Sequence, residues 1–155
     1  MLQRLGRWLR TAGYDTEIVS DGRRDYELLK QARKEDRILL TCDKALSEYR
    51  DAEKHVVVLN MGSLNDFVSE VSELCNIDWG HKPFTRCINC NSALQEANLE
   101  QRKLIPNEVP QEQISQLVYY CPKCNKVYWD GGHVERMRSQ LEHWQLQFSN
   151  EKKAP

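Results

Sequence analysis

The sequence predicts an α/β domain followed by a small cysteine-rich β module, and two observations lead to this prediction. Through residues 1–75, short apolar segments with strand character alternate with amphipathic segments of helical spacing, which is the pattern of an α/β layer structure. In the second half of the chain, the phrase Cys-x-x-Cys-Asn occurs twice. The composition changes near residues 77–83, so we expect domains at 1–80 and 83–147 and a disordered tail at 148–155.

In the first domain, the spacing of apolar residues predicts each element in turn. Near the N-terminus, apolar residues recur at helical spacing: Leu2, Leu5, Trp8 and Leu9. Gly13 is well placed to end this helix. Six elements follow in chain order: a strand at 16–20, a helix at 25–33, a strand at 37–41, a short helix from residue 44, a strand at 55–59 and a helix at 64–74. Ser63 and Asp66 have the spacing of a capping box at the start of that last helix.

In the cysteine-rich module, two apolar segments at 117–120 and 126–129 flank the second cysteine pair. They predict a β-hairpin with the cysteine turn at its tip, which is a zinc-ribbon arrangement. Gly131 and Gly132 then indicate the start of a C-terminal helix. One face of that helix is apolar: Val134, Met137, Leu141 and Trp144.

The two cysteine pairs have the spacing of metal ligands: Cys87 and Cys90, then Cys121 and Cys124. Two residues between cysteines let both thiolates face one ion from a tight turn, and two such turns complete the four-sulfur shell that zinc prefers. A disulfide or redox motif needs only one such pair and does not explain the repeat. The asparagine after each pair suits a left-handed backbone conformation. We therefore predict a structural Zn²⁺ site.

Composition limits the location and the partners of the chain. A net charge of −1 over 155 residues provides no uniform positive field, so a nucleic acid would bind to a local patch. The two remaining cysteines, Cys42 and Cys75, are expected to be free thiols. Free thiols beside a thiolate metal site indicate a reducing compartment, and we predict a cytoplasmic protein. No apolar segment is long enough to cross a bilayer, so no membrane partner is expected.

Acidic residues follow the predicted strands of the first domain. Asp43 comes just after the strand at 37–41, while Asp21, Asp25 and Glu27 come after the strand at 16–20. Ligand sites of open α/β sheets form outside the carboxyl ends of the strands, and carboxylates suit Mg²⁺ or Mn²⁺. The same acids also suit helix starts, Asp43 as an N-cap and Asp25 through the helix dipole. Spacing alone leaves both interpretations open.

Taken together, these motifs resemble one family, the Mut-seven carboxy-terminal RNase domain, in which a PIN-like nuclease fold is fused to a zinc ribbon. The matching phrases run in order through nearly the whole chain: Arg4-Leu5-Gly6-Arg7-Trp8-Leu9-Arg10, Asp25-x-x-Leu28-Leu29, Thr41-x-Asp43, Pro83-Phe84-x-Arg86-Cys87-x-x-Cys90, Cys121-Pro122-x-Cys124 and Val127-Tyr128-Trp129-x-Gly131-x-His133. The resemblance implies a PIN-like parallel sheet with flanking helices and a metal-dependent ribonuclease that hydrolyses RNA phosphodiester bonds.

The resemblance also implies roles for particular residues. Asp43, Asp25 and Asp15 match the acids of the family and would hold the catalytic Mg²⁺ or Mn²⁺. RNA contacts would come from the N-terminal arginines and from residues near the second cysteine turn: Arg4, Arg7, Arg10, Trp129 and His133. Tyr120 and Tyr128 could stack on unpaired bases in the same way. The alternatives are a solvated helix face for the arginines, a small ribbon core for the aromatic residues and a helix cap for His133.

The chain departs from the family at its beginning. Family members usually start with a hydrophobic strand that ends in an aspartate, a few residues before the Met-Leu phrase, whereas here that phrase is Met1-Leu2. We expect that the natural chain starts upstream of Met1. Otherwise the domain lacks a central strand and one metal ligand, and its exposed sheet edge would favour a homodimer. In that case the chain would be an inactive zinc-ribbon module that binds RNA or a protein.

Overall fold

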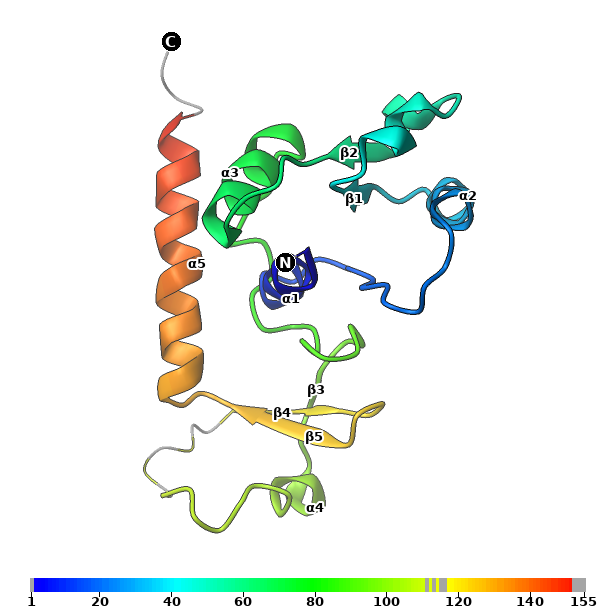
Figure 1. Cartoon of the computed structure of the whole chain (residues 1–155). Helices are drawn as coiled ribbons and strands as arrows, with labels where there is room; N and C mark the ends of the chain where they lie inside the picture. Colours follow the sequence, from blue (N-terminus) through cyan, green and yellow to red (C-terminus); the bar gives the residue numbers. More distant parts are fainter. Residues whose placement is uncertain (1, 111, 113, 115–116, 152–155) are drawn as a thin grey trace. The chain divides into compact units, whose positions relative to one another are not determined.

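The computed structural model describes residues 2–110, 112, 114 and 117–151, which divide into two compact units (Figure 1). Unit 1 comprises the described residues up to Gly6 together with Glu17–Ile77. Unit 2 comprises Arg7–Thr16 together with the described residues from Asp78 onward. Helix α1 (Leu2–Thr11) contributes residues to both units.

A two-stranded parallel sheet lies at the centre of unit 1. Strands β1 (Leu39–Thr41) and β2 (Val56–Val58) pair in register, and two short 3₁₀ helices connect them, η1 (Lys44–Glu48) and η2 (Ala52–Lys54). Three of these elements contribute a buried residue to a core cluster, Leu46 from η1, Ala52 from η2 and Val56 from β2, and Leu29 completes the cluster. Both strands were predicted from their apolar residues, and both are shorter than expected.

Two helices complete unit 1 as the sequence predicted, namely α2 (Asp25–Glu35) and α3 (Leu64–Leu74). Leu29 of α2 and Phe67 of α3 are fully buried. The predicted capping box is confirmed, because the Ser63 amide donates to Asp66 at 2.7 Å and the Asp66 amide donates to Ser63 Oγ at 3.3 Å.

The predicted strand at 16–20 is wrong, since residues 14–20 have no regular secondary structure. Side chains take the place of a strand partner at Thr16. The Thr16 amide donates to Asn91 Oδ1 at 3.1 Å, and the Thr16 carbonyl accepts from Arg10 Nε at 2.7 Å. With these groups bonded to side chains, the segment does not join the sheet. The parallel sheet of the described chain therefore has two strands.

Unit 2 contains a three-stranded antiparallel sheet in the order β3 (Gln95–Glu96), β4 (Val118–Cys121) and β5 (Lys126–Trp129). The predicted hairpin is β4 and β5, with Val118 opposite Trp129 and Cys121 opposite Lys126. Strand β3 and the short helix α4 (Leu99–Arg102) were not predicted.

The C-terminal helix α5 (Gly132–Glu151) begins at the predicted glycine pair. Its buried side chains include Leu141 and Phe148, and Trp144 packs with its ring centroid 4.8 Å from that of Trp8 and 5.0 Å from that of Trp79. Residues 148–151 belong to this helix rather than to the tail predicted at 148–155, and the rest of that tail lies outside the described residues. In the part of the chain that the structure describes, no helix is both long enough and apolar enough to span a bilayer.

Candidate metal centre and acidic residues

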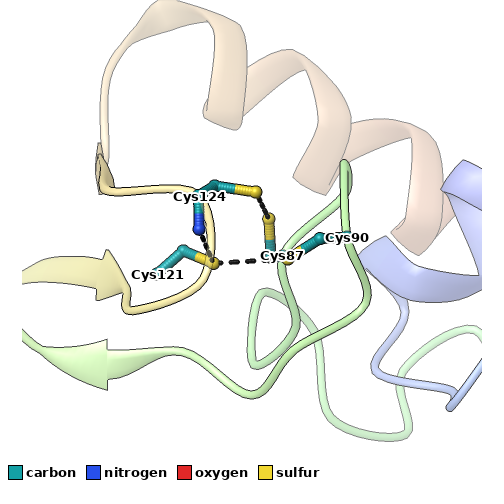
Figure 2. A group of neighbouring side chains, drawn as sticks. All are labelled: Cys87, Cys90, Cys121 and Cys124. Atoms are coloured by element: carbon teal, nitrogen blue, oxygen red, sulfur yellow. Dashed lines mark hydrogen bonds between the residues drawn. The ribbon is translucent and has the colours of Figure 1, made fainter.

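Four cysteine side chains of unit 2 meet as predicted (Figure 2): Cys87, Cys90, Cys121 and Cys124. Their sulfur atoms all lie within 4.8 Å of one another, with 3.4 Å between Cys90 and Cys121 and 3.8 Å between Cys87 and Cys124. In a regular tetrahedron, four sulfurs about 2.3 Å from a zinc ion are about 3.8 Å apart. The group thus has the donor type, number and spacing of a closed Zn²⁺ site.

Both cysteine turns have the same backbone geometry. The Asn91 amide donates to the Cys87 carbonyl at 2.8 Å, and the Asn125 amide donates to the Cys121 carbonyl at 2.9 Å. Both asparagines have positive φ angles, 71° for Asn91 and 54° for Asn125. Asparagine adopts this left-handed conformation more readily than most residues. The backbone conformation predicted from the repeated phrase is confirmed.

Two hydroxyl groups contact the cysteine sulfurs. Tyr128 Oη lies 3.0 Å from Cys87 Sγ, and Ser92 Oγ lies 3.4 Å from Cys90 Sγ. Burial and then the hydrogen bond to Cys87 raise the pKa of Tyr128 above its usual range, so its hydroxyl stays protonated and can donate to a thiolate. Burial opposes ionisation of Cys90, but hydrogen bonds with Ser92, Cys124 and Cys121 together outweigh it and lower the pKa of Cys90 to about 6. Tyr128 therefore supports the metal centre through its hydroxyl group.

Arg10 has a structural role in unit 2 rather than the phosphate contact that the sequence suggested. Its side chain is buried, with the residue 5% exposed. Its guanidinium donates to the carbonyls of Ile88 and Asn89 at 3.0 and 2.8 Å, in addition to Thr16. These two carbonyls belong to the residues between Cys87 and Cys90. A guanidinium held in this way by backbone carbonyls is not available to a phosphate.

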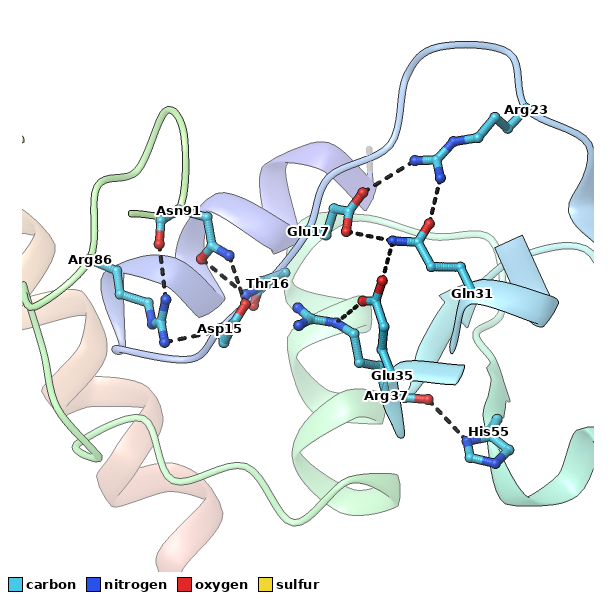
Figure 3. Close-up of polar contacts among 10 residues, drawn as sticks. All are labelled: Asp15, Thr16, Glu17, Arg23, Gln31, Glu35, Arg37, His55, Arg86 and Asn91. Carbon is cyan, nitrogen blue, oxygen red and sulfur yellow. Dashed lines mark hydrogen bonds and ion pairs between the residues drawn. The ribbon is translucent and has the colours of Figure 1, made fainter. Parts of the chain in front are cut away.

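Asp15 is also bonded within unit 2 (Figure 3). Its carboxylate accepts a hydrogen bond from Asn91 Nδ2 at 2.7 Å and forms an ion pair with Arg86 at 3.5 Å. Arg86 also donates to the Asn91 carbonyl at 3.0 Å. Asp15 therefore helps to fix the first cysteine turn, a role that the sequence did not suggest.

Asp43 lies directly after β1 in unit 1 and caps the following 3₁₀ helix. Its Oδ1 accepts from the Ala45 amide at 2.9 Å, and its own amide donates to Thr41 Oγ1 at 3.0 Å. Thr41 is buried at the end of the strand, so these two bonds fix the turn of the Thr-x-Asp phrase. The N-cap alternative for Asp43 is thus confirmed. A carboxylate has two oxygens, and a cap of this kind occupies one of them.

Asp25 is exposed in the first turn of α2, where the helix dipole stabilises an acid. Two nearby acids are paired with one cation. Arg23 lies 2.8 Å from Asp21, and it lies 3.2 Å from Glu17 (Figure 3). The hydrogen bonds from Arg23 lower the pKa of Asp21, which is the mark of a carboxylate already satisfied by a partner. Within the described residues of unit 1, no three acidic groups gather as the cysteines do in unit 2.

The remaining residues predicted to bind RNA lie at or near the surface. Arg4, Arg7 and His133 are exposed, and Trp129 is half-buried on β5. Because side chains alternate along a strand, the pairs of Val118 with Trp129 and of Tyr120 with Val127 share one face of the hairpin. Tyr128 is on the opposite face. The exposed residues and Trp129 remain predictions for RNA binding.

Comparison with protein families finds one match that covers most of the chain. The family model described as Mut7-C RNAse domain matches residues 1–141. Comparisons with curated proteins and with solved structures give no significant match.

Proposed function

The chain belongs to the Mut7-C RNAse domain family, and from this premise we propose that it is a metal-dependent ribonuclease that hydrolyses RNA phosphodiester bonds. The observation that carries the proposal is the extent of the family match, which includes both the Thr41-x-Asp43 turn and the four-cysteine group. We also propose that the chain has two domains, a PIN-like nuclease domain at 1–80 and a zinc ribbon at 83–147.

The proposed catalytic acids are Asp43 and Asp25. Exposed carboxylates are the donors that Mg²⁺ and Mn²⁺ prefer, so the donor type fits a hard divalent ion. When bound, such an ion activates a water molecule and offsets charge on the phosphate and on the leaving oxygen. Asp43 would be a ligand from the carboxyl end of β1, held there by its bonds to Ala45 and Thr41.

Asp15 was predicted as the third acid, and its contacts with Asn91 and Arg86 make it a structural residue of unit 2. We therefore propose a catalytic set in which Asp43 contributes most and Asp25 less, with Asp15 acting on the stability of the ribbon. Exposed RNA contacts would come from Arg4, Arg7 and His133, together with Trp129.

The zinc ribbon would hold RNA but would not cut it. Four thiolate ligands leave no open coordination position for water or phosphate, so a zinc ion in this shell is structural. The half-buried rings of Trp129 and Tyr120 share one face of the hairpin and could stack on unpaired bases.

A ribonuclease assay on single-stranded RNA with Mn²⁺ tests this function. We expect cleavage by the wild-type chain and a loss in Asp43→Asn that exceeds the roughly 10- to 100-fold cost of removing an outer partner of a metal ligand. Asp66→Asn is the matched control, because Asp66 is also an acid that accepts a backbone hydrogen bond at a helix start. RNA binding without metal-dependent cleavage would instead indicate a binding module.

A further inference from the structure

Side chains from a distant segment of the chain contact the first cysteine turn, whereas the second turn is contacted from within its own hairpin. The Asn125 side chain accepts a hydrogen bond from Tyr120 at 2.9 Å, within the β4–β5 hairpin. The Asn91 side chain instead bonds to Asp15 and to the Thr16 amide, 76 and 75 residues away in sequence. The two turns thus share a backbone hydrogen bond and a left-handed asparagine, but the asparagine side chains bond to different parts of the chain.

Arg10 makes the most direct of these distant contacts. Its guanidinium donates to the carbonyls of both residues between Cys87 and Cys90, which fixes the orientation of two peptide groups in the chain that joins the two ligands. In the second turn the corresponding residues are Pro122 and Lys123, which are exposed, as Asn89 is in the first turn. The chain flanking the first turn also has local bonds, namely the bridge between Arg86 and Ala93 and a hydrogen bond from the Cys87 amide to the Ser92 carbonyl at 2.9 Å.

Charge adds a second reason for a buried arginine here. Four thiolates and one Zn²⁺ ion carry a net charge of about −2, which is costly in a partly buried site without a nearby cation. Arg10 is held close to the first turn by its three carbonyl bonds, and its planar guanidinium can satisfy all three without losing its charge.

We propose that Arg10 is a positioning residue for the zinc centre, and that zinc binding and the docking of residues 7–16 stabilise each other. The guanidinium holds the first cysteine turn in its ligating conformation. By linkage, zinc binding favours the docking of residues 7–16 by the same coupling free energy by which that docking favours zinc binding. Both covalent connections of this segment, at Gly6 and at Thr16, lead into unit 1. Zinc loss would therefore weaken the docking of residues 7–16 within unit 2.

Zinc transfer to a chromogenic chelator tests the positioning role. We expect Arg10→Ala to release zinc about tenfold faster than the wild-type chain, as for the loss of other outer partners of metal ligands. Arg10→Lys should restore only part of the difference, because one ammonium group lacks the fixed fork of donors. Arg7→Ala is the matched control, since Arg7 is exposed one turn earlier on α1. Equal release rates in the four proteins would overturn the proposal.

Amide hydrogen exchange tests the reciprocal effect, first in the wild-type chain and then in Arg10→Ala. In the wild-type chain, peptides covering 7–16 should lose protection together with the first cysteine turn as zinc is withdrawn. In zinc-loaded Arg10→Ala the same peptides should exchange faster, while the β4–β5 hairpin keeps its protection. Protection of 7–16 that persists after the first turn has opened would overturn the coupling, as would an Arg10→Ala pattern identical to the wild type.

Discussion

In unit 2 the fold brings four cysteine sulfur atoms together, whereas among the described residues of unit 1 it does not gather the acidic side chains into such a group. The four sulfur atoms lie within 4.8 Å of one another and are supported by Tyr128, Ser92 and Arg10. Asp25 and Asp43 are exposed at helix starts, where each already has a local role. Buried soft ligands are gathered by turns and packing, whereas exposed like charges repel one another and need a cation to bring them together. We therefore expect zinc to determine folding and Mg²⁺ or Mn²⁺ to determine turnover.

The largest effect is expected from removing a zinc ligand. Cys121→Ser should abolish zinc binding and unfold unit 2, because structural zinc sites contribute on the order of 10 kcal/mol to folding. Cys121 is fully buried at the end of β4, so a repositioned serine could not compensate. Circular dichroism during thermal unfolding and a zinc assay would measure both losses.

Cys75→Ser is the control for this variant. Cys75 is a partly buried free cysteine outside the four-cysteine group, and burial raises its pKa, so it stays a neutral thiol. The control should keep zinc and the folded state. A Cys121→Ser protein that retained both would refute the view that the thiolate centre organises unit 2.

The next largest effect is expected from substitutions of Asp43. Two different substitutions there separate its proposed role in catalysis from its role in stability. Asparagine is as good an N-cap as aspartate, so Asp43→Asn should have the same unfolding temperature as the wild-type chain. It should nevertheless lose Mn²⁺-dependent cleavage. Asp43→Ala should lose the same activity and also about 1 kcal/mol of stability, because the Ala45 amide loses its acceptor. Thermal unfolding and RNA cleavage measured on the same samples test this. If Asp43→Asn still cleaved RNA, the role of Asp43 would be to cap the helix and not to take part in catalysis.

Substitution of Asp15 is expected to affect stability rather than cleavage. Its ion pair with Arg86 is half exposed, and such pairs contribute less than about 1 kcal/mol. Asp15→Ala should therefore lower the stability of unit 2 slightly and leave the Mn²⁺ dependence of cleavage unchanged. A shift of the Mn²⁺ titration without a change in unfolding temperature would return Asp15 to the catalytic set.

The sequence was most informative where local chemistry decides the structure. The cysteine spacing, the left-handed asparagines and the Ser63 capping box are set by a few adjacent residues, and all three are confirmed. The capping box of Asn98 and Gln101 is a similar pattern that could have identified α4.

The errors arose where distant contacts decide. Thr16 follows a strand-like pattern, but its amide is bonded to Asn91, and no local property of residues 16–20 reveals this. Arg10 alternates with apolar residues like a solvated arginine, yet the first cysteine turn buries it. Whether the proposed catalytic acids Asp43 and Asp25 come together also depends on distant contacts, so their spacing in the sequence cannot predict it.

The smallest predicted effect concerns the hydroxyl of Tyr128. Tyr128→Phe keeps the ring on β5 but removes the hydroxyl 3.0 Å from Cys87 Sγ, so packing should be preserved while the sulfur loses a hydrogen-bond partner. We expect zinc release to become a few-fold faster, because a metal ligand without its outer partner is held less firmly. Tyr120→Phe is the matched control, because its hydroxyl donates to Asn125 and not to a sulfur. If both variants released zinc at the wild-type rate, the thiolate group would be supported by the backbone, Ser92 and Arg10 without a contribution from the Tyr128 hydroxyl.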